Sequence, residues 1–151
     1  MRRWAGWLSM IIVLAGIILT GCSSKGSSES AGAEPASVEA IEGSKVGKVT
    51  VTEEGANRIG LKTEAVRVLT MRGAPTLART VIPLAAVLYD HDGISWVYTS
   101  PESLTFVRQR VLIDHVDGDS AVLRSGPAPG TPVVTVGGAE LLGTEYVVEG
   151  E

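Results

Sequence analysis

Residues 94–116, ISWVYTSPESLTFVRQRVLIDHV, carry the alternation that decides the fold. Ile94, Trp96 and Tyr98 alternate with residues that are smaller or more polar. A cluster of turn-forming residues, Ser100 to Ser103, follows, and residues 104–116 then alternate again. Because a period of two is typical of β-strands, this stretch predicts two strands joined by a turn.

Short runs of the same kind recur on both sides of this stretch. They are separated by clusters of Gly, Pro, Asp and Ser, which favour turns. The runs are residues 49–51, 63–69, 80–89, 120–125, 133–136 and 145–148. Short strands at this spacing predict a mainly β fold, a small β-barrel or roll.

One short helix is predicted at Glu53–Ile59. Thr52 offers a capping oxygen, and Glu53 and Glu54 place negative charge in the first turn, where the helix dipole favours it. Gly60 is suited to the left-handed conformation that ends many helices.

The N-terminus has the three parts of a secretory leader. Arg2 and Arg3 precede an apolar run from Met10 to Leu19, and Cys22, the only cysteine, follows Gly21. A cysteine at this place resembles a bacterial lipobox, with cleavage before Cys22 and fatty acyl chains such as palmitate on its sulfur. Two alternatives are an uncleaved transmembrane anchor over residues 4–21 and a buried core helix. The apolar run alone is shorter than the roughly 20 residues that a membrane span needs.

These features predict three parts. Residues 1–21 are a lipoprotein signal peptide, residues 22–45 are a flexible tether rich in Ser, Gly, Ala and Glu, and residues 46–148 are a folded β domain. The protein is expected to be anchored by lipid to the cell membrane, facing the extracytoplasmic or periplasmic side. A pair of acyl chains holds a protein to a membrane more firmly than one.

Composition excludes several functions. The formal net charge is −4 and no basic cluster is present, which argues against a nucleic-acid partner. With Cys22 acylated, no thiol remains for a disulfide or a nucleophile. No motif for a nucleophilic serine or a phosphate-binding loop occurs, so neither catalysis nor a cofactor is expected.

Four segments resemble periplasmic adaptor subunits of resistance-nodulation-division (RND) efflux systems, which are HlyD-like membrane fusion proteins. Residues 49–63 resemble the opening segment of these adaptors, and residues 81–98 resemble the start of their C-terminal membrane-proximal domain. Residues 126–134 resemble a later Pro-Gly turn and strand, and residues 137–143 resemble the ending of the heavy-metal-efflux branch.

One departure from the family is large. Adaptors carry a lipoyl-like domain, a helical hairpin and a β-barrel between the first two segments, whereas here only residues 66–80 lie between them. About 15 residues are too few for such an excursion. The resemblance therefore implies the membrane-proximal domain alone. It also implies docking to an inner-membrane efflux transporter or to a full-length adaptor, unless the chain is a remnant without a role.

Two predicted turns offer candidates for a metal site. His91 lies between Asp90 and Asp92, and His115 lies in a second turn rich in Asp. Imidazole and carboxylate groups are ligands for ions such as Zn²⁺. The alternative interpretation is that these residues only shape the ends of hairpins. The metal interpretation would make the protein an envelope metal-binding or metal-sensing lipoprotein.

A contact surface for a partner is predicted on the strand from residue 104. Phe106, Arg108 and Arg110 lie on one face of that strand in the alternating pattern. An exposed strand edge can pair with a partner strand. The alternative is an ordinary strand whose arginines are solvated.

Overall fold

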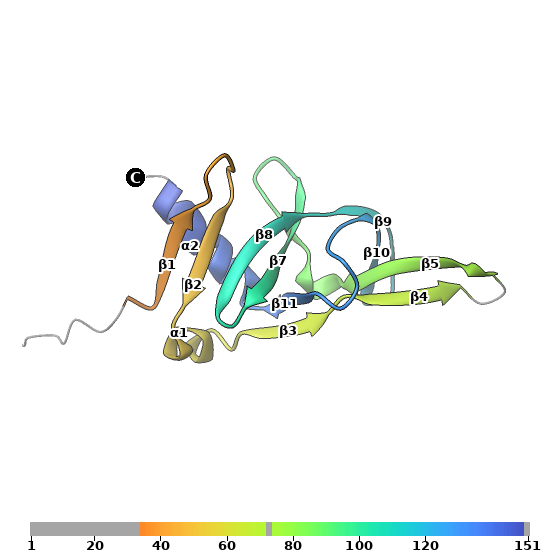
Figure 1. Cartoon of the computed structure of the whole chain (residues 1–151), viewed down its shortest axis with the longest axis horizontal. Coiled ribbons are helices and arrows are strands. Elements are labelled where there is room, and N and C mark those ends of the chain that lie inside the picture. Colours follow the sequence, from red (N-terminus) through yellow and green to blue (C-terminus); the bar gives the residue numbers. More distant parts are fainter. Residues whose placement is uncertain (1–33, 72–73, 150–151) are drawn as a thin grey trace, which may run out of the picture. The chain divides into compact units, whose positions relative to one another are not determined.

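Two antiparallel β-sheets account for most of the fold in a computed structural model that describes residues 34–71 and 74–149 (Figure 1). All of these residues belong to one unit, residues 31–151. The first sheet has the strand order β1-β2-β8-β7-β11-β3, with β6 also paired to β7, and the second has the order β4-β5-β10-β9. The predicted mainly β class is confirmed. The strands form two open sheets, and no closed barrel occurs in the described residues.

The strands and helices are short. The strands of the first sheet are β1 (Ala36–Ala40), β2 (Gly47–Val51), β3 (Lys62–Ala65), β6 (Leu88–Tyr89), β7 (Ser95–Glu102), β8 (Thr105–Arg110) and β11 (Pro132–Val136). The strands of the second sheet are β4 (Arg67–Met71), β5 (Ala74–Pro83), β9 (Leu112–Asp117) and β10 (Ser120–Ser125). The helices are α1 (Glu53–Arg58), the single 3₁₀ turn η1 (Leu84–Ala86) and α2 (Gly138–Glu149).

The predicted strand over residues 104–116 is divided at Val111. β8 belongs to the first sheet and β9 to the second. Between them the Val111 side chain is buried in a core cluster that draws residues from both sheets, and its N–H bonds to the Ser95 carbonyl at 3.0 Å. The alternation continues through this point, and for that reason the pattern alone did not show where the chain changes sheets.

The predicted helix at Glu53–Ile59 is confirmed as α1, which ends one residue earlier. The Thr52 Oγ1 accepts a hydrogen bond from the Gly55 N–H at 3.0 Å, which is the capping arrangement expected. Gly60 has a φ of 63°, and the Leu61 N–H bonds back to the Ala56 carbonyl at 2.9 Å.

The predicted strand at residues 145–148 is wrong, because these residues lie in α2. Gly137 adopts a φ of 90° directly after the end of β11. The chain then forms a helix that buries Leu141 and, one turn later, Glu145. Packing of these two side chains overrides the strand preference of the valines at 147 and 148.

The predicted tether, residues 22–45, extends too far, because β1 lies within it. β1 pairs with β2 over five residue pairs, from Ala36 opposite Val51 to Ala40 opposite Gly47. Ala36 and Val38 also pack against a second core cluster, which contains Val49 and Phe106. The polar composition of residues 22–45 gave no sign of this strand. β1 is stabilised by its hydrogen bonds to β2, which a local sequence pattern does not show.

We expect Thr52→Ala to lower the free energy of unfolding by about 1 kcal/mol, because the Gly55 N–H loses its capping acceptor. Urea denaturation followed by circular dichroism measures this. Thr52→Ser keeps the oxygen and should lie close to the wild type. Equal losses in both variants would show that the methyl group, and not the cap, is important.

Candidate functional site

A buried ion pair attaches α2 to the first sheet. Glu145 of α2 is fully buried and Arg108 of β8 is 7% exposed. The Glu145 Oε1 accepts hydrogen bonds from the Gly47 N–H at 2.8 Å and from Arg108 Nη2 at 3.2 Å. A carboxylate is tolerated at this depth because it is paired with a cation and accepts several hydrogen bonds.

Tyr98 of β7 is the third hydrogen-bond partner of the Glu145 carboxylate. It is fully buried, and its hydroxyl donates a hydrogen bond to the Glu145 Oε2. Burial, followed by the bond to Glu145 and the negative charge of that carboxylate, raises the pKa of Tyr98 well above its usual value of 10.0. Glu145 therefore has contacts with β2, β7 and β8, which are three neighbouring strands.

Aromatic rings surround the guanidinium group of Arg108. Its central carbon lies 4.6 Å from the ring centroid of Trp96 and 5.4 Å from that of Tyr146, distances typical of cation–π contacts. Arg108 Nη1 also donates to the Tyr146 hydroxyl at 3.3 Å. Two consecutive residues of α2, Glu145 and Tyr146, thus bind the same arginine.

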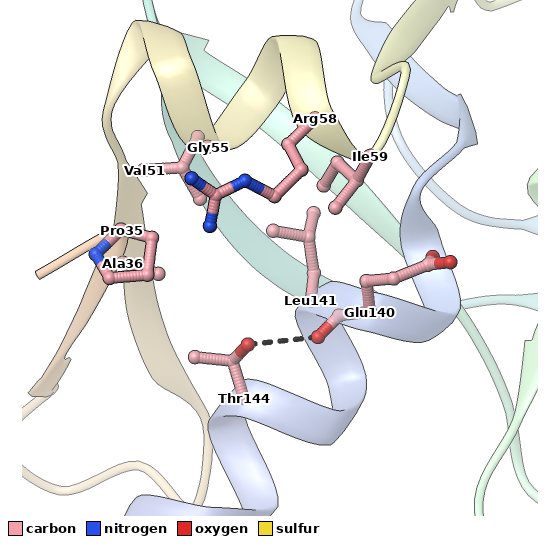
Figure 2. A pocket seen from close by; sticks show the side chains of 9 residues that line it. All are labelled: Pro35, Ala36, Val51, Gly55, Arg58, Ile59, Glu140, Leu141 and Thr144. Carbon is pink, nitrogen blue, oxygen red and sulfur yellow. Dashed lines mark hydrogen bonds between the residues drawn. The ribbon is translucent and has the colours of Figure 1, made fainter.

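The position of α2 creates an apolar pocket beside β1. Figure 2 shows residues of β1, β2, α1 and α2 around it, and its volume is about 170 Å³. Its lining residues are Pro35, Ala36, Val51, Gly55, Arg58, Ile59, Glu140, Leu141 and Thr144. The helix α1 lies close to the backbone of Pro35 in this pocket. A Cβ added to Gly55 would lie 2.5 Å from the Pro35 carbonyl oxygen, so the approach requires glycine at this position.

An open groove continues from this pocket between β1 and α2. The pocket and the groove have three lining residues in common, which are Ala36, Glu140 and Thr144. The groove is further lined by Glu34, Ser37, Val38, Gly143 and Val147. Val147 is 70% exposed although its side chain is apolar. We call the pocket and groove together the β1–α2 groove.

The charges at the β1–α2 groove are mainly acidic. Glu34 and Glu140 are both exposed along it. Arg58, the one cation among the described residues that line the groove, forms an ion pair with Glu54 at 2.9 Å. The groove therefore combines apolar walls with two carboxylates, a combination that suits an apolar and cationic peptide better than an anionic ligand.

The predicted contact surface on β8 is not an exposed patch. Phe106 is 2% exposed in the second core cluster, and Arg108 is held by Glu145. Arg110 alone of the three is exposed. The pattern did not show that a helix covers this face of β8, because residues 145–148 of α2 were predicted to form a strand.

His91 lies in the turn between β6 and β7, as predicted, whereas His115 lies not in a turn but within β9, where it pairs with Val122 of β10. The Asp90 Oδ1 accepts hydrogen bonds from the backbone N–H groups of Asp92 and Ile94, at 3.0 and 2.8 Å. Its Oδ2 accepts from Trp96 Nε1 at 2.9 Å. Although desolvation opposes ionisation, these bonds together lower the pKa of Asp90.

Each histidine side chain lies beside the carboxylate of an adjacent aspartate. His91 Nε2 lies 3.4 Å from Asp92 Oδ2, and His115 Nδ1 lies 3.0 Å from Asp114 Oδ2. Hydrogen bonds from Arg124 and from His115 lower the pKa of Asp114. Within residues 34–71 and 74–149, no group of three or more His, Cys, Asp or Glu side chains is placed to hold a metal ion.

Cys22, the predicted lipidation site, lies outside the described residues. Among the helices that the structure does describe, none has the length and apolar character needed to cross a membrane.

Sequence reasoning missed Glu145, Tyr98 and Tyr146 as members of one cluster. The available signal was the run Ala139-Glu140-Leu141-Leu142 after Gly137-Gly138, since these four residues favour helices. A helix that starts there places Leu141 and Glu145 on one face, four residues apart.

The chain matched none of the protein-family models against which it was compared, and no match was found among the curated proteins.

We expect Glu145→Gln to lower the free energy of unfolding by about 3–5 kcal/mol, because Arg108 would be left buried without a counter-charge. Chemical denaturation measures the loss. Glu140→Gln, on the exposed side of the same helix, is the matched control and should change stability by no more than about 0.5 kcal/mol. Equal effects of the two substitutions would mean that the buried pair does not hold α2.

Alkaline pH should destabilise the protein through Tyr98. Its pKa is raised in the folded state, so above about pH 10 the unfolded chain loses the phenol proton while the folded chain keeps it. The stabilisation is complete below pH 10 and decreases as pH rises, by about 1.4 kcal/mol per pH unit.

Denaturation at a series of pH values from 8 to 11 tests this. The stability of Tyr98→Phe should fall less steeply than that of the wild type above pH 10. Tyr89 is 60% exposed, so Tyr89→Phe should follow the wild-type curve. Parallel curves for all three proteins would contradict the assignment.

Proposed function

We propose that this protein is a lipid-anchored, extracytoplasmic docking module of an efflux or transport system, similar to the membrane-proximal domain of an adaptor and not an enzyme. One observation carries the proposal. Three of the four segments that resemble parts of that domain lie far apart in the chain, and each contributes strands to the first sheet.

The first segment, residues 49–63, contributes β2, α1 and the start of β3. The later segments contribute β7 and β11. In the sheet, β2 pairs with β8, β8 with β7, β7 with β11, and β11 with β3. Strands from the opening segment thus lie at both sides of the strands from the later ones. The family resemblance implies such an assembly from two distant parts of the chain.

The hairpin β4–β5 occupies the place in the chain where adaptors carry their central domains. Arg67 pairs with Val81, and Val68 pairs with Thr80, so the chain leaves and returns at neighbouring positions. A domain inserted at such a point would leave the sheet intact. This geometry is compatible with an adaptor that has a short hairpin in place of the excursion.

The β1–α2 groove supplies a surface for docking. It is apolar and exposed, and its wall α2 is held by a buried ion pair. A rigid wall favours binding, because little conformational freedom remains to be lost when a partner associates.

The alternative function, envelope metal binding or sensing, stays a prediction from the sequence around His91 and His115. Calorimetric titration of the protein with Zn²⁺, Cu²⁺ and Ca²⁺ tests it. Binding that disappears in the double variant His91→Ala, His115→Ala would favour this alternative.

Membrane attachment is tested by Cys22→Ser. If Cys22 carries acyl chains, the variant should stay unprocessed or move to the soluble fraction, whereas Ser23→Ala should fractionate as the wild type does. Immunoblots of membrane and soluble fractions, with metabolic labelling by a fatty acid, give the readout. A Cys22→Ser protein that is processed normally and remains membrane-bound would contradict the lipid anchor.

The docking function is tested by photo-crosslinking in intact cells. A benzophenone amino acid at position 147, in the groove, should capture a subunit of an inner-membrane transporter or a full-length adaptor. The same amino acid at position 112, exposed on β9 of the second sheet, is the matched control. Absence of any transport protein from the position 147 products would overturn the proposal.

A further inference from the structure

β1 is the most regular of the sheet edges in the described part of the chain. Its ladder with β2 runs through five consecutive residue pairs without a register shift. The other edge strands are less suited to this role: β3, β4 and β9 each have at least one register shift in their single ladder, and β6 has only two residues. Irregular edges resist pairing with further strands, so β1 is the edge best suited to accept one.

One hydrogen bond identifies which residues of β1 have backbone groups that point away from β2. The Thr52 N–H bonds to the Pro35 carbonyl at 3.0 Å, directly before the first ladder pair. In an antiparallel ladder, bonded and non-bonded pairs alternate. Ala36, Val38 and Ala40 are therefore the residues whose N–H and C=O groups face outward, and no described strand pairs with them.

The β1–α2 groove runs along this same edge. Ala36, Ser37 and Val38 of β1 line one side, and Gly143 and Val147 of α2 line the other. A strand added to β1 would place every second side chain on the α2 side of the sheet, because strand side chains alternate between faces. Those side chains would enter an apolar groove.

The charges select the chemistry of the added strand. Glu34 and Glu140 are exposed at the groove, while Arg58 is paired with Glu54. We propose that β1 binds an extended segment of a partner protein as an additional strand. Its apolar side chains lie in the β1–α2 groove, and a Lys or Arg side chain faces Glu34 and Glu140. This inference rests on the proposed docking function and names the surface and the kind of segment it binds.

A selection experiment tests the chemistry. The purified full chain in detergent is presented with a phage-displayed library of random nonapeptides. We expect enrichment of sequences in which every second residue is apolar and in which Lys or Arg occurs, as strand addition to an acidic edge requires. Enriched peptides without basic residues, or no enrichment above a chain-free control, would overturn the proposal.

Variants of β1 and α2 test the geometry with a labelled enriched peptide. Ala40→Pro removes an outward N–H and leaves the bonds to β2 in place, and proline is tolerated at such edge positions. Affinity should fall at least about tenfold in Ala40→Pro and stay within about twofold in Ala40→Ser. Glu140→Lys should weaken binding about tenfold at low salt, and the difference should shrink as salt is added.

Hydrogen exchange of the wild-type protein gives a readout that does not depend on any variant. Peptide binding should slow exchange at the amides of Val38 and Ala40. Unchanged exchange there, or wild-type affinity in a folded Ala40→Pro protein, would overturn strand addition. Because the selection uses no transporter, its failure would leave the crosslinking result at position 147 intact, and failure of crosslinking would leave peptide binding intact.

Discussion

The pairing of Glu145 with Arg108 is the contact on which the first sheet and α2 depend. A charge that is buried this deeply is expensive unless every strong acceptor position is used, and the carboxylate bonds to Gly47, Tyr98 and Arg108. These three partners lie on β2, β7 and β8, respectively, and the three strands are neighbours in the sheet. One side chain of α2 therefore requires that these strands and the helix all be in place.

The rest of the groove follows from that constraint. With α2 held against the sheet, Leu141 fills the second core cluster, and Glu140, Gly143 and Val147 face the side of β1. The pocket under α1 forms because Gly55 lets the helix approach the Pro35 carbonyl. The β1–α2 groove is thus built from residues of both ends of the described chain. Its rigidity comes from a buried ion pair that lies outside the groove itself.

Sequence patterns were reliable where a local rule was sufficient. The cap at Thr52, the stop at Gly60 and the turn at Asp90 use hydrogen bonds within a few residues, and each is present as expected. Phe106 and Arg108 were placed correctly on one face of a strand. Their burial was not foreseen, since it depends on α2, about 40 residues further along the chain. The candidate site was for this reason the part least accessible to sequence reasoning.

The sequence alone determined the mainly β class, the position of α1 and the leader-like layout around Cys22, because each depends on periodicity or on near neighbours. Only the tertiary structure decided that residues 36–40 form a strand, that residues 145–148 belong to a helix and that the chain changes sheets at Val111. The reason is common to all three. Their conformations are stabilised by partners far away in the chain: β2 for the strand, Arg108 and Tyr98 for the helix, and a core drawn from both sheets for Val111.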